Sequence, residues 1–159
     1  MVDLKLDTTS LNFAELTKLV FKNFKNNKRV VIEIYDGNIE KRISPTIFSE
    51  LKKRNVLSIT SDSILIDDGY AISELKPILK RHYTNNDLKF SYPESYSKAV
   101  VEITLDTNAT KKDLKQTLIN LTRNFDEINS ELKYSLSLRT YLSIFRQIPP
   151  PPQLKEEKE

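Results

Sequence analysis

The sequence predicts a single compact α+β domain in which a mostly antiparallel sheet is covered by helices. Three observations lead to this fold class. The 159 residues suit one domain, and 38% of them are apolar, which is enough for a packed core. Short apolar stretches flank turn-forming dipeptides, as in β-hairpins. Other segments repeat apolar residues every three or four positions, which indicates helices.

The predicted elements group into four parts. A helix and two hairpin–helix units occupy residues 1–83, and an irregular connector follows at 84–98. A β-α-β-type unit over residues 99–148 is expected to pack on the first part. Residues 149–159 are expected to form a Pro-rich, disordered tail.

Residues 13–27 predict the first helix. Its apolar side chains recur at helical spacing and therefore share one face; they are Phe13, Leu16, Val20 and Phe24. Basic residues recur on the opposite face, where solvent or a partner can reach them; they are Lys18, Lys22, Lys25 and, beyond the helix, Arg29.

Residues 30–43 predict the first β-hairpin. Asp36-Gly37 is expected to form its two-residue turn, because this dipeptide accepts the positive φ angles of a type I′ turn. In this register one face of the hairpin is nearly all apolar. The same register places Glu33 opposite Glu40, a like-charge pair that solvent must screen.

Residues 45–54 predict a second helix, because Ser44 can cap its start and Pro45 suits its first position. A second hairpin is expected over residues 57–66, around an Asp-Ser turn. Another helix is expected over 73–83, beginning at a capping serine.

Residues 44–83 together suggest a winged-helix-like arrangement, with 45–54 as the recognition helix and 57–67 as the wing. Two observations weaken this interpretation. Only one helix lies between the two hairpins, whereas a helix-turn-helix needs two in succession. The expected wing is also acidic, where contact with phosphates would need Lys or Arg. Base-specific reading of DNA is therefore not expected.

In the β-α-β-type unit, residues 99–105 predict a strand and 110–125 a helix. The segment 131–148 fits two patterns. Alternation of apolar and polar residues favours a strand over 132–139 and then a short helix to about residue 147. Helical spacing of its aromatic and aliphatic residues leaves one continuous helix open as the alternative.

The residue inventory offers little for catalysis. Cysteine is absent, which excludes thiolate metal sites and cysteine nucleophiles. His82 is the single histidine and is expected to pack or to cap a helix. The two glycines, Gly37 and Gly69, lie in predicted turns, so no glycine-rich phosphate loop exists. No catalytic residue, metal site or cofactor is expected.

Acidic residues near the second hairpin are the best case for a metal centre. Asp62 lies at the predicted hairpin tip, whereas Asp67 and Asp68 lie at its far end on opposite faces. Mg²⁺ and Mn²⁺ need several carboxylates within a few ångströms. These three residues are therefore not expected to converge on one ion.

Basic residues are concentrated in the N-terminal third. Residues 1–60 contain eleven Lys and Arg against seven Asp and Glu. If the first helix packs beside the first hairpin, these cations line one surface that contacts phosphates without reading base sequence. The alternative is an ordinary solvated surface. The candidate nucleic-acid-binding residues are Lys18, Lys22, Lys25, Arg29, Lys41, Arg42, Lys52, Lys53 and Arg54.

Three functions are compatible with this sequence. The first is a non-catalytic accessory protein that docks onto a larger intracellular assembly, one that processes nucleic acid. The second is direct nucleic-acid binding by the N-terminal basic surface. The third, disfavoured above, is a metal-dependent phosphoryl-transfer enzyme. A polyproline segment, Pro149, Pro150, Pro151 and Pro152, is a candidate for docking to a protein partner.

The expected location is the cytoplasm, with no membrane contact. The apolar runs are only a few residues long, too short for a transmembrane span. The N-terminus also lacks the basic-then-apolar order of a signal peptide.

Overall fold

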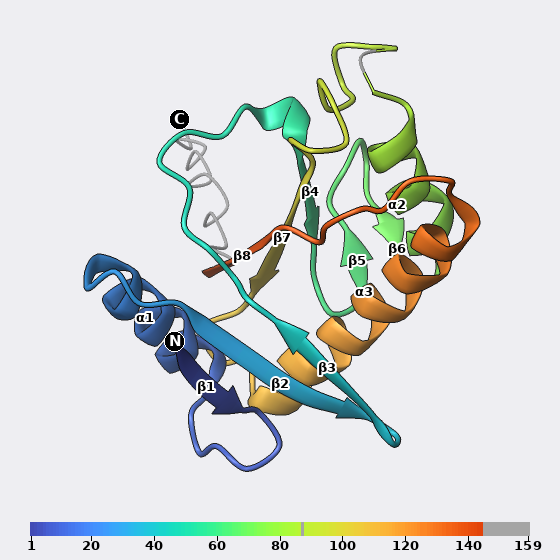
Figure 1. Ribbon diagram of the computed structural model, residues 1–159. Coiled ribbons are helices and arrows are strands. Elements are labelled where there is room, and N and C mark those ends of the chain that lie inside the picture. Colours follow the sequence, from blue (N-terminus) through green and yellow to red (C-terminus); the bar gives the residue numbers. More distant parts are fainter. Residues whose placement is uncertain (87, 145–159) are drawn as a thin grey trace, which may run out of the picture.

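The computed structural model describes residues 1–86 and 88–144 as an α+β domain with two mixed sheets and three α-helices (Figure 1). The first sheet has the order β1-β2-β3 and the second the order β6-β5-β4-β7-β8. The strands are β1 (Val2–Lys5), β2 (Val30–Asp36), β3 (Ile39–Ile43), β4 (Val56–Ile59), β5 (Ser63–Ile64), β6 (Tyr70–Ala71), β7 (Val100–Leu105) and β8 (Thr140–Ile144). The helices are α1 (Phe13–Lys25), α2 (Leu75–Thr84), α3 (Lys111–Glu131) and the 3-10 turns η1 (Lys53–Asn55) and η2 (Ile72–Glu74).

The single α+β domain is confirmed, but its sheets are mixed and not mostly antiparallel. Strand pairs β1–β2, β4–β7 and β7–β8 are parallel, whereas β2–β3, β4–β5 and β5–β6 are antiparallel. Parallel neighbours arise where a helix carries the chain back to the starting edge, as α1 and α3 do here. Strand β1 was not expected, because VDLK is too short and polar to give a strand pattern.

The first hairpin forms, but its register differs from the predicted one. Its turn is Gly37-Asn38, and only the first of these two residues has a positive φ, as in a type II′ turn. Strand β2 is thereby displaced by two residues along β3. Glu33 now lies opposite Arg42, with a 2.8 Å ion pair, and no longer opposite Glu40. The observed register therefore removes the like-charge pair while the same face stays apolar.

The helix predicted over residues 45–54 does not form. Residues 44–52 run as an irregular segment, and only η1 follows. The N–H of Thr46 donates to the carbonyl of Thr140 at the start of β8, and the Phe48 ring packs edge-on against Tyr141 at 6.0 Å. These tertiary contacts replace helical bonding, so the recognition helix of a winged-helix arrangement is missing.

The second hairpin is confirmed in a short form, with Ile59 opposite Ile64. Helix α2 is also confirmed, and its predicted face is buried: Leu75, Ile78, Leu79 and His82. Its start differs, because η2 precedes it and no side chain caps α2. Ser73 therefore lies within η2 and is not the predicted cap.

The β-α-β unit is confirmed as β7-α3-β8, with different boundaries in its second half. Helix α3 continues to Glu131, and Thr110 begins it with a capping box to Asp113. Residues 132–139 form no strand, and the strand lies at Thr140–Ile144 instead, where a helix was expected. The remainder of that predicted helix and the polyproline segment lie outside the described residues.

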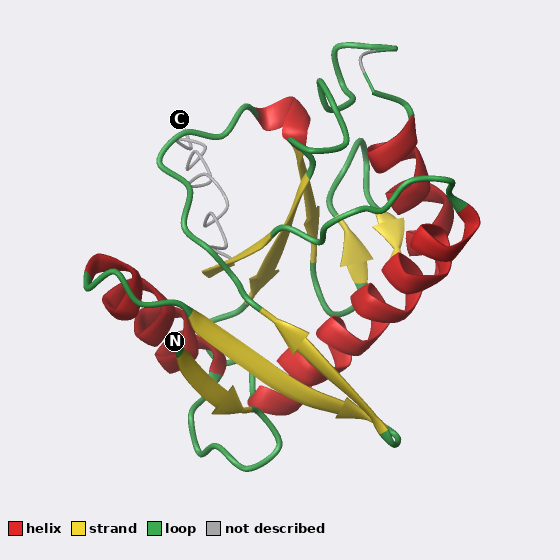
Figure 2. Cartoon of the chain, in the orientation of Figure 1, coloured by secondary structure: helices red, strands yellow, loops and turns green. Residues whose placement is uncertain are grey.

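One hydrophobic core joins both sheets and all three α-helices. Figure 2 shows α3 running along the molecule from the first sheet toward α2. The predicted stripe of α3 is buried in this core: Leu114, Leu118, Leu121 and Phe125. Phe24 of α1, predicted to be buried, is 46% exposed, because the last turn of α1 lies at the edge of the molecule (Figure 1).

Candidate functional site

Helix α1 and the loop after it carry a cationic face. Between residues 16 and 32 there are five Lys and Arg and no Asp or Glu, so this stretch has a formal charge of +5. The whole chain has +3, and the remainder is therefore net negative. We call the following exposed residues the α1 cationic face: Lys18, Lys22, Lys25, Lys28 and Arg29.

None of the α1 cations forms an ion pair with a described residue. Basic side chains in other described parts of the chain commonly form ion pairs with carboxylates, which neutralise their charge. Basic residues that pair with a described carboxylate include Lys41, Arg42, Lys52, Lys76, Lys80, Lys98, Lys115 and Arg123. Within the described part of the chain, no carboxylate therefore neutralises the α1 cations.

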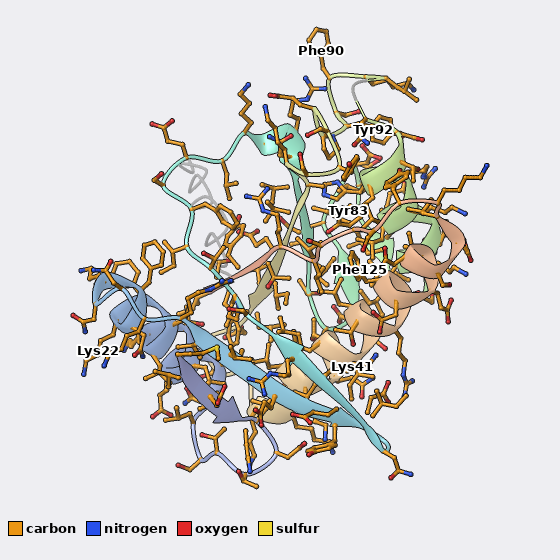
Figure 3. The ribbon with its side chains drawn as sticks, viewed as in Figure 1. Lys22, Lys41, Tyr83, Phe90, Tyr92 and Phe125 are labelled. Atoms are coloured by element: carbon orange, nitrogen blue, oxygen red, sulfur yellow. The ribbon has the colours of Figure 1, made fainter. Side chains whose placement is uncertain are left out.

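The structure does not bring the other predicted basic residues onto this face. Lys41 points toward α3, where its ammonium donates to Thr122 at 3.0 Å and lies 3.4 Å from the Asp126 carboxylate. Figure 3 shows Lys22 and Lys41 in separate parts of the molecule. Arg42 pairs with Asp3 at 2.9 Å as well as with Glu33.

The basic residues around η1 lie near the connector and hold it in place. The ammonium groups of Lys52 and Lys98 donate hydrogen bonds to the Glu94 carboxylate. These bonds, the one from Lys52 most strongly, lower the pKa of that carboxyl to about 2. Arg54 donates to the carbonyl oxygens of Tyr92 at 2.7 Å and Lys89 at 3.2 Å. Lys53 is exposed at the same turn.

Two exposed aromatic rings lie among the α1 cations: Phe24, which was predicted to be buried, and Phe21, which the sequence patterning did not single out. Phe21 and Phe24 are each 46% exposed, and the Lys25 ammonium lies 4.5 Å from the centre of the Phe21 ring. Phe21 falls outside the three- and four-residue spacing of the buried face. That departure, together with Lys22 and Lys25 beside it, was the available signal for an exposed aromatic.

An apolar groove of about 330 Å³ adjoins the aromatic edge of this face. It lies between α1, the irregular segment after β3, and β8. Its walls are Thr17, Val20, Phe21, Thr46, Ile47, Phe48, Leu51, Tyr141 and Leu142. Phe21 lines the groove and contacts Lys25, so the groove adjoins the α1 cationic face.

The acidic residues considered for a metal centre do not gather. Asp62 accepts hydrogen bonds from Thr60 and Ser63, which lower its pKa and fix it within the turn. Asp67 accepts from the Tyr70 hydroxyl at 3.4 Å. Within residues 1–86 and 88–144, no three His, Cys, Asp or Glu side chains are placed to hold a metal ion.

No family model, curated protein or solved structure matches this chain. Among the helices of the described residues, none has the length and apolar character needed to cross a membrane.

Proposed function

We propose that this chain is a non-catalytic binding protein of an assembly that handles nucleic acid, and that the α1 cationic face contacts the nucleic acid. One observation carries the proposal: five exposed cations occur in succession without a carboxylate, in a chain that is otherwise net negative. Such a face attracts a polyanion, because binding neutralises phosphates and releases their counterions.

The exposed rings favour a single strand over a duplex. Bases of a single strand can stack on aromatic side chains, and this stacking depends little on sequence. Phe21 and Phe24 offer two such rings between the lysines. Phosphates would contact the lysine ammonium groups while the bases lie on the rings, so we expect little sequence preference.

Fluorescence anisotropy with a labelled oligothymidylate tests the contact. We expect affinity to fall steeply as salt is added. The triple variant Lys18→Glu, Lys22→Glu, Lys25→Glu should lose measurable binding. With the milder triple change to Gln, the slope of log affinity against log salt should decrease by about two, since each contact to a single strand contributes about 0.7.

A charge-matched control is available on other surfaces. Lys89, Lys112 and Lys133 are exposed, so Lys→Glu at these three positions changes the net charge equally. That control should retain most of the binding. Equal loss in both triple variants would show that only net charge matters, and a flat salt response in the wild type would overturn the proposal.

A further inference from the structure

The apolar groove beside α1 has aromatic side chains from three parts of the fold in its walls. Phe21 comes from α1, Phe48 from the irregular segment after β3, and Tyr141 from β8. The rings of Phe48 and Tyr141 meet edge-on, with their centres 6.0 Å apart. The groove therefore offers an aromatic lining to a flat ligand.

Cations lie on two of these rings. The Lys25 ammonium is 4.5 Å from the centre of the Phe21 ring, and the Arg139 guanidinium carbon is 5.0 Å from the centre of the Phe48 ring. A hydrogen bond to the Ser97 carbonyl at 2.6 Å orients the Arg139 guanidinium. Neither cation pairs with a described carboxylate, and the described walls of the groove contain none. Two walls of the groove, from different elements, thus carry uncompensated positive charge.

The edge of β8 adds unpaired backbone groups to the groove. Strand β8 is the last strand of its sheet, and the Val101 N–H of β7 donates to the Arg139 carbonyl. Alternate residues bond to the neighbour in a parallel ladder, so the backbone groups of Thr140 and Leu142 point away from β7. The Thr46 N–H donates to the Thr140 carbonyl, whereas the N–H and carbonyl of Leu142 have no partner among the described residues. Leu142 therefore presents a donor and an acceptor at the groove wall.

A nucleobase on a phosphate backbone matches this combination. A base is flat and packs on aromatic rings, and the phosphates on either side of it are anionic. Each base also has a neighbouring donor and acceptor on its Watson–Crick edge, which suit the two backbone groups of Leu142. A proline-rich peptide would use the rings alone and leave both cations without a counterion.

The size of the groove admits any base. Its volume of about 330 Å³ is well above the roughly 150 Å³ that holds benzene in a protein cavity. Purines and pyrimidines therefore both fit, in agreement with the small sequence preference expected of the α1 cationic face.

We propose that the groove receives one unstacked base of the single strand that the α1 cationic face binds, an inference that rests on the proposed function. The base packs against the rings of Phe21 and Phe48 and bonds to the backbone of Leu142. The phosphates on its two sides contact Lys25 and Arg139. A base that is paired within a duplex does not enter, so the groove selects single strands without selecting the base.

Fluorescence anisotropy of the full chain tests the groove with two labelled strands of equal length. One is an oligothymidylate, and the other consists of abasic nucleotides, which keep the phosphates and lack the bases. Phe48→Ala should weaken binding of the oligothymidylate by about fivefold or more, the lower end of what stacking of one base on an aromatic ring contributes. The same substitution should leave binding of the abasic strand unchanged, because no base is there to lose the contact.

Phe90→Ala is the matched control. Phe90 is 93% exposed, lies outside the groove and also has a guanidinium near its ring, that of Arg54 at 6.0 Å. This variant should bind both strands as the wild type does. Circular dichroism verifies that both variants are folded.

The outcomes separate this inference from the proposed function. Oligothymidylate binding that requires Lys18, Lys22 and Lys25 but survives Phe48→Ala would overturn the groove assignment and leave the proposed function intact. Equal weakening of both strands would give Phe48 a structural role and the groove to another occupant, such as a peptide segment, which also overturns the assignment. Binding of neither strand by the wild type would overturn both proposals.

Discussion

The Tyr83 side chain is fully buried, with 0% of it exposed, and its hydroxyl lies in the core. Among the described residues, no group forms a hydrogen bond with this hydroxyl. Burial raises the pKa of this hydroxyl well above its usual range. Its ring meets Phe125 edge-on at 5.5 Å, so the ring and not the hydroxyl is expected to stabilise the fold (Figure 3).

Tyr83→Phe should therefore leave the free energy of unfolding unchanged or raise it by about 1 kcal/mol, because it removes an unpaired buried polar group. Tyr83→Ala should lower it by about 3–5 kcal/mol through loss of the ring. Urea denaturation measures both, with Tyr134→Phe at the surface as control. A loss above about 1 kcal/mol in Tyr83→Phe would show that the hydroxyl has a partner.

His82 makes the stability of the chain sensitive to mild acid. Its Nε2 lies 3.1 Å from the Val100 carbonyl, to which the neutral ring donates, and burial lowers its pKa from 6.5 to about 4. The unfolded chain therefore binds a proton below pH 6.5 that the folded chain binds only near pH 4. The contribution of neutral His82 to stability is therefore complete above pH 6.5 and is lost as the pH falls from 6.5 to about 4.

We expect the free energy of unfolding to fall by roughly 3 kcal/mol across that interval, because a tenfold difference in proton affinity is worth about 1.4 kcal/mol. Urea denaturation from pH 7.5 to 4.5 measures the fall, and His82→Gln should flatten the curve. Glu94 and Glu131, whose pKa is lowered from 4.5 to about 2, lose their contribution only below this range. If the free energy of unfolding of His82→Gln falls with pH as steeply as that of the wild type, other groups cause the effect.

At the scale of elements, the first hairpin depends on one glycine. Gly37 has a φ of 61°, and a Cβ added there would meet no atom within 4 Å. Gly37→Ala should therefore destabilise the fold by about 1 kcal/mol through backbone strain alone. Gly37→Asn should cost less, because Asn tolerates this conformation. Thermal unfolding compares them, and equal losses would point to a cause other than φ.

The elements that could be predicted are those whose own residues determine them. Helices α1 and α3 carry apolar stripes and capping residues, and both form. Prediction from local sequence failed where tertiary contacts determine the backbone conformation. Pro45 begins no helix, because the backbone N–H of Thr46 donates to Thr140 at the start of β8. The hairpin turn lies one residue later than predicted, and in this register Glu33 pairs with Arg42. Strand β8 pairs with a partner about forty residues away, which no local pattern shows.

The candidate sites were predictable to different degrees. Three of the α1 cations, Lys18, Lys22 and Lys25, lie on one helix, so helical spacing alone located them. The apolar groove beside α1 was not predicted, because its walls come in part from the segment after β3 and from β8, both of which the sequence assigned to helices.

At the scale of the whole molecule, α3 connects the two sheets. Near its middle, Arg123 pairs with Asp36 at the end of β2, and Thr122 accepts from Lys41 of β3. At its end, Glu131 pairs with Lys76 and Lys80 of α2, both at 2.8 Å. The buried stripe of α3 belongs to the core shared by both sheets, so neither sheet has a separate core.

Leu118 lies fully buried on that stripe. Leu118→Ala should lower the free energy of unfolding by about 3 kcal/mol, because it leaves a cavity in the shared core. Since both sheets pack on this core, amide hydrogens of β2 and β7 should lose protection by the same factor. Hydrogen exchange measured by NMR compares them, with Lys112→Ala on the exposed side of α3 as control. Loss of protection in one sheet alone would mean that the sheets unfold separately and that α3 does not couple them.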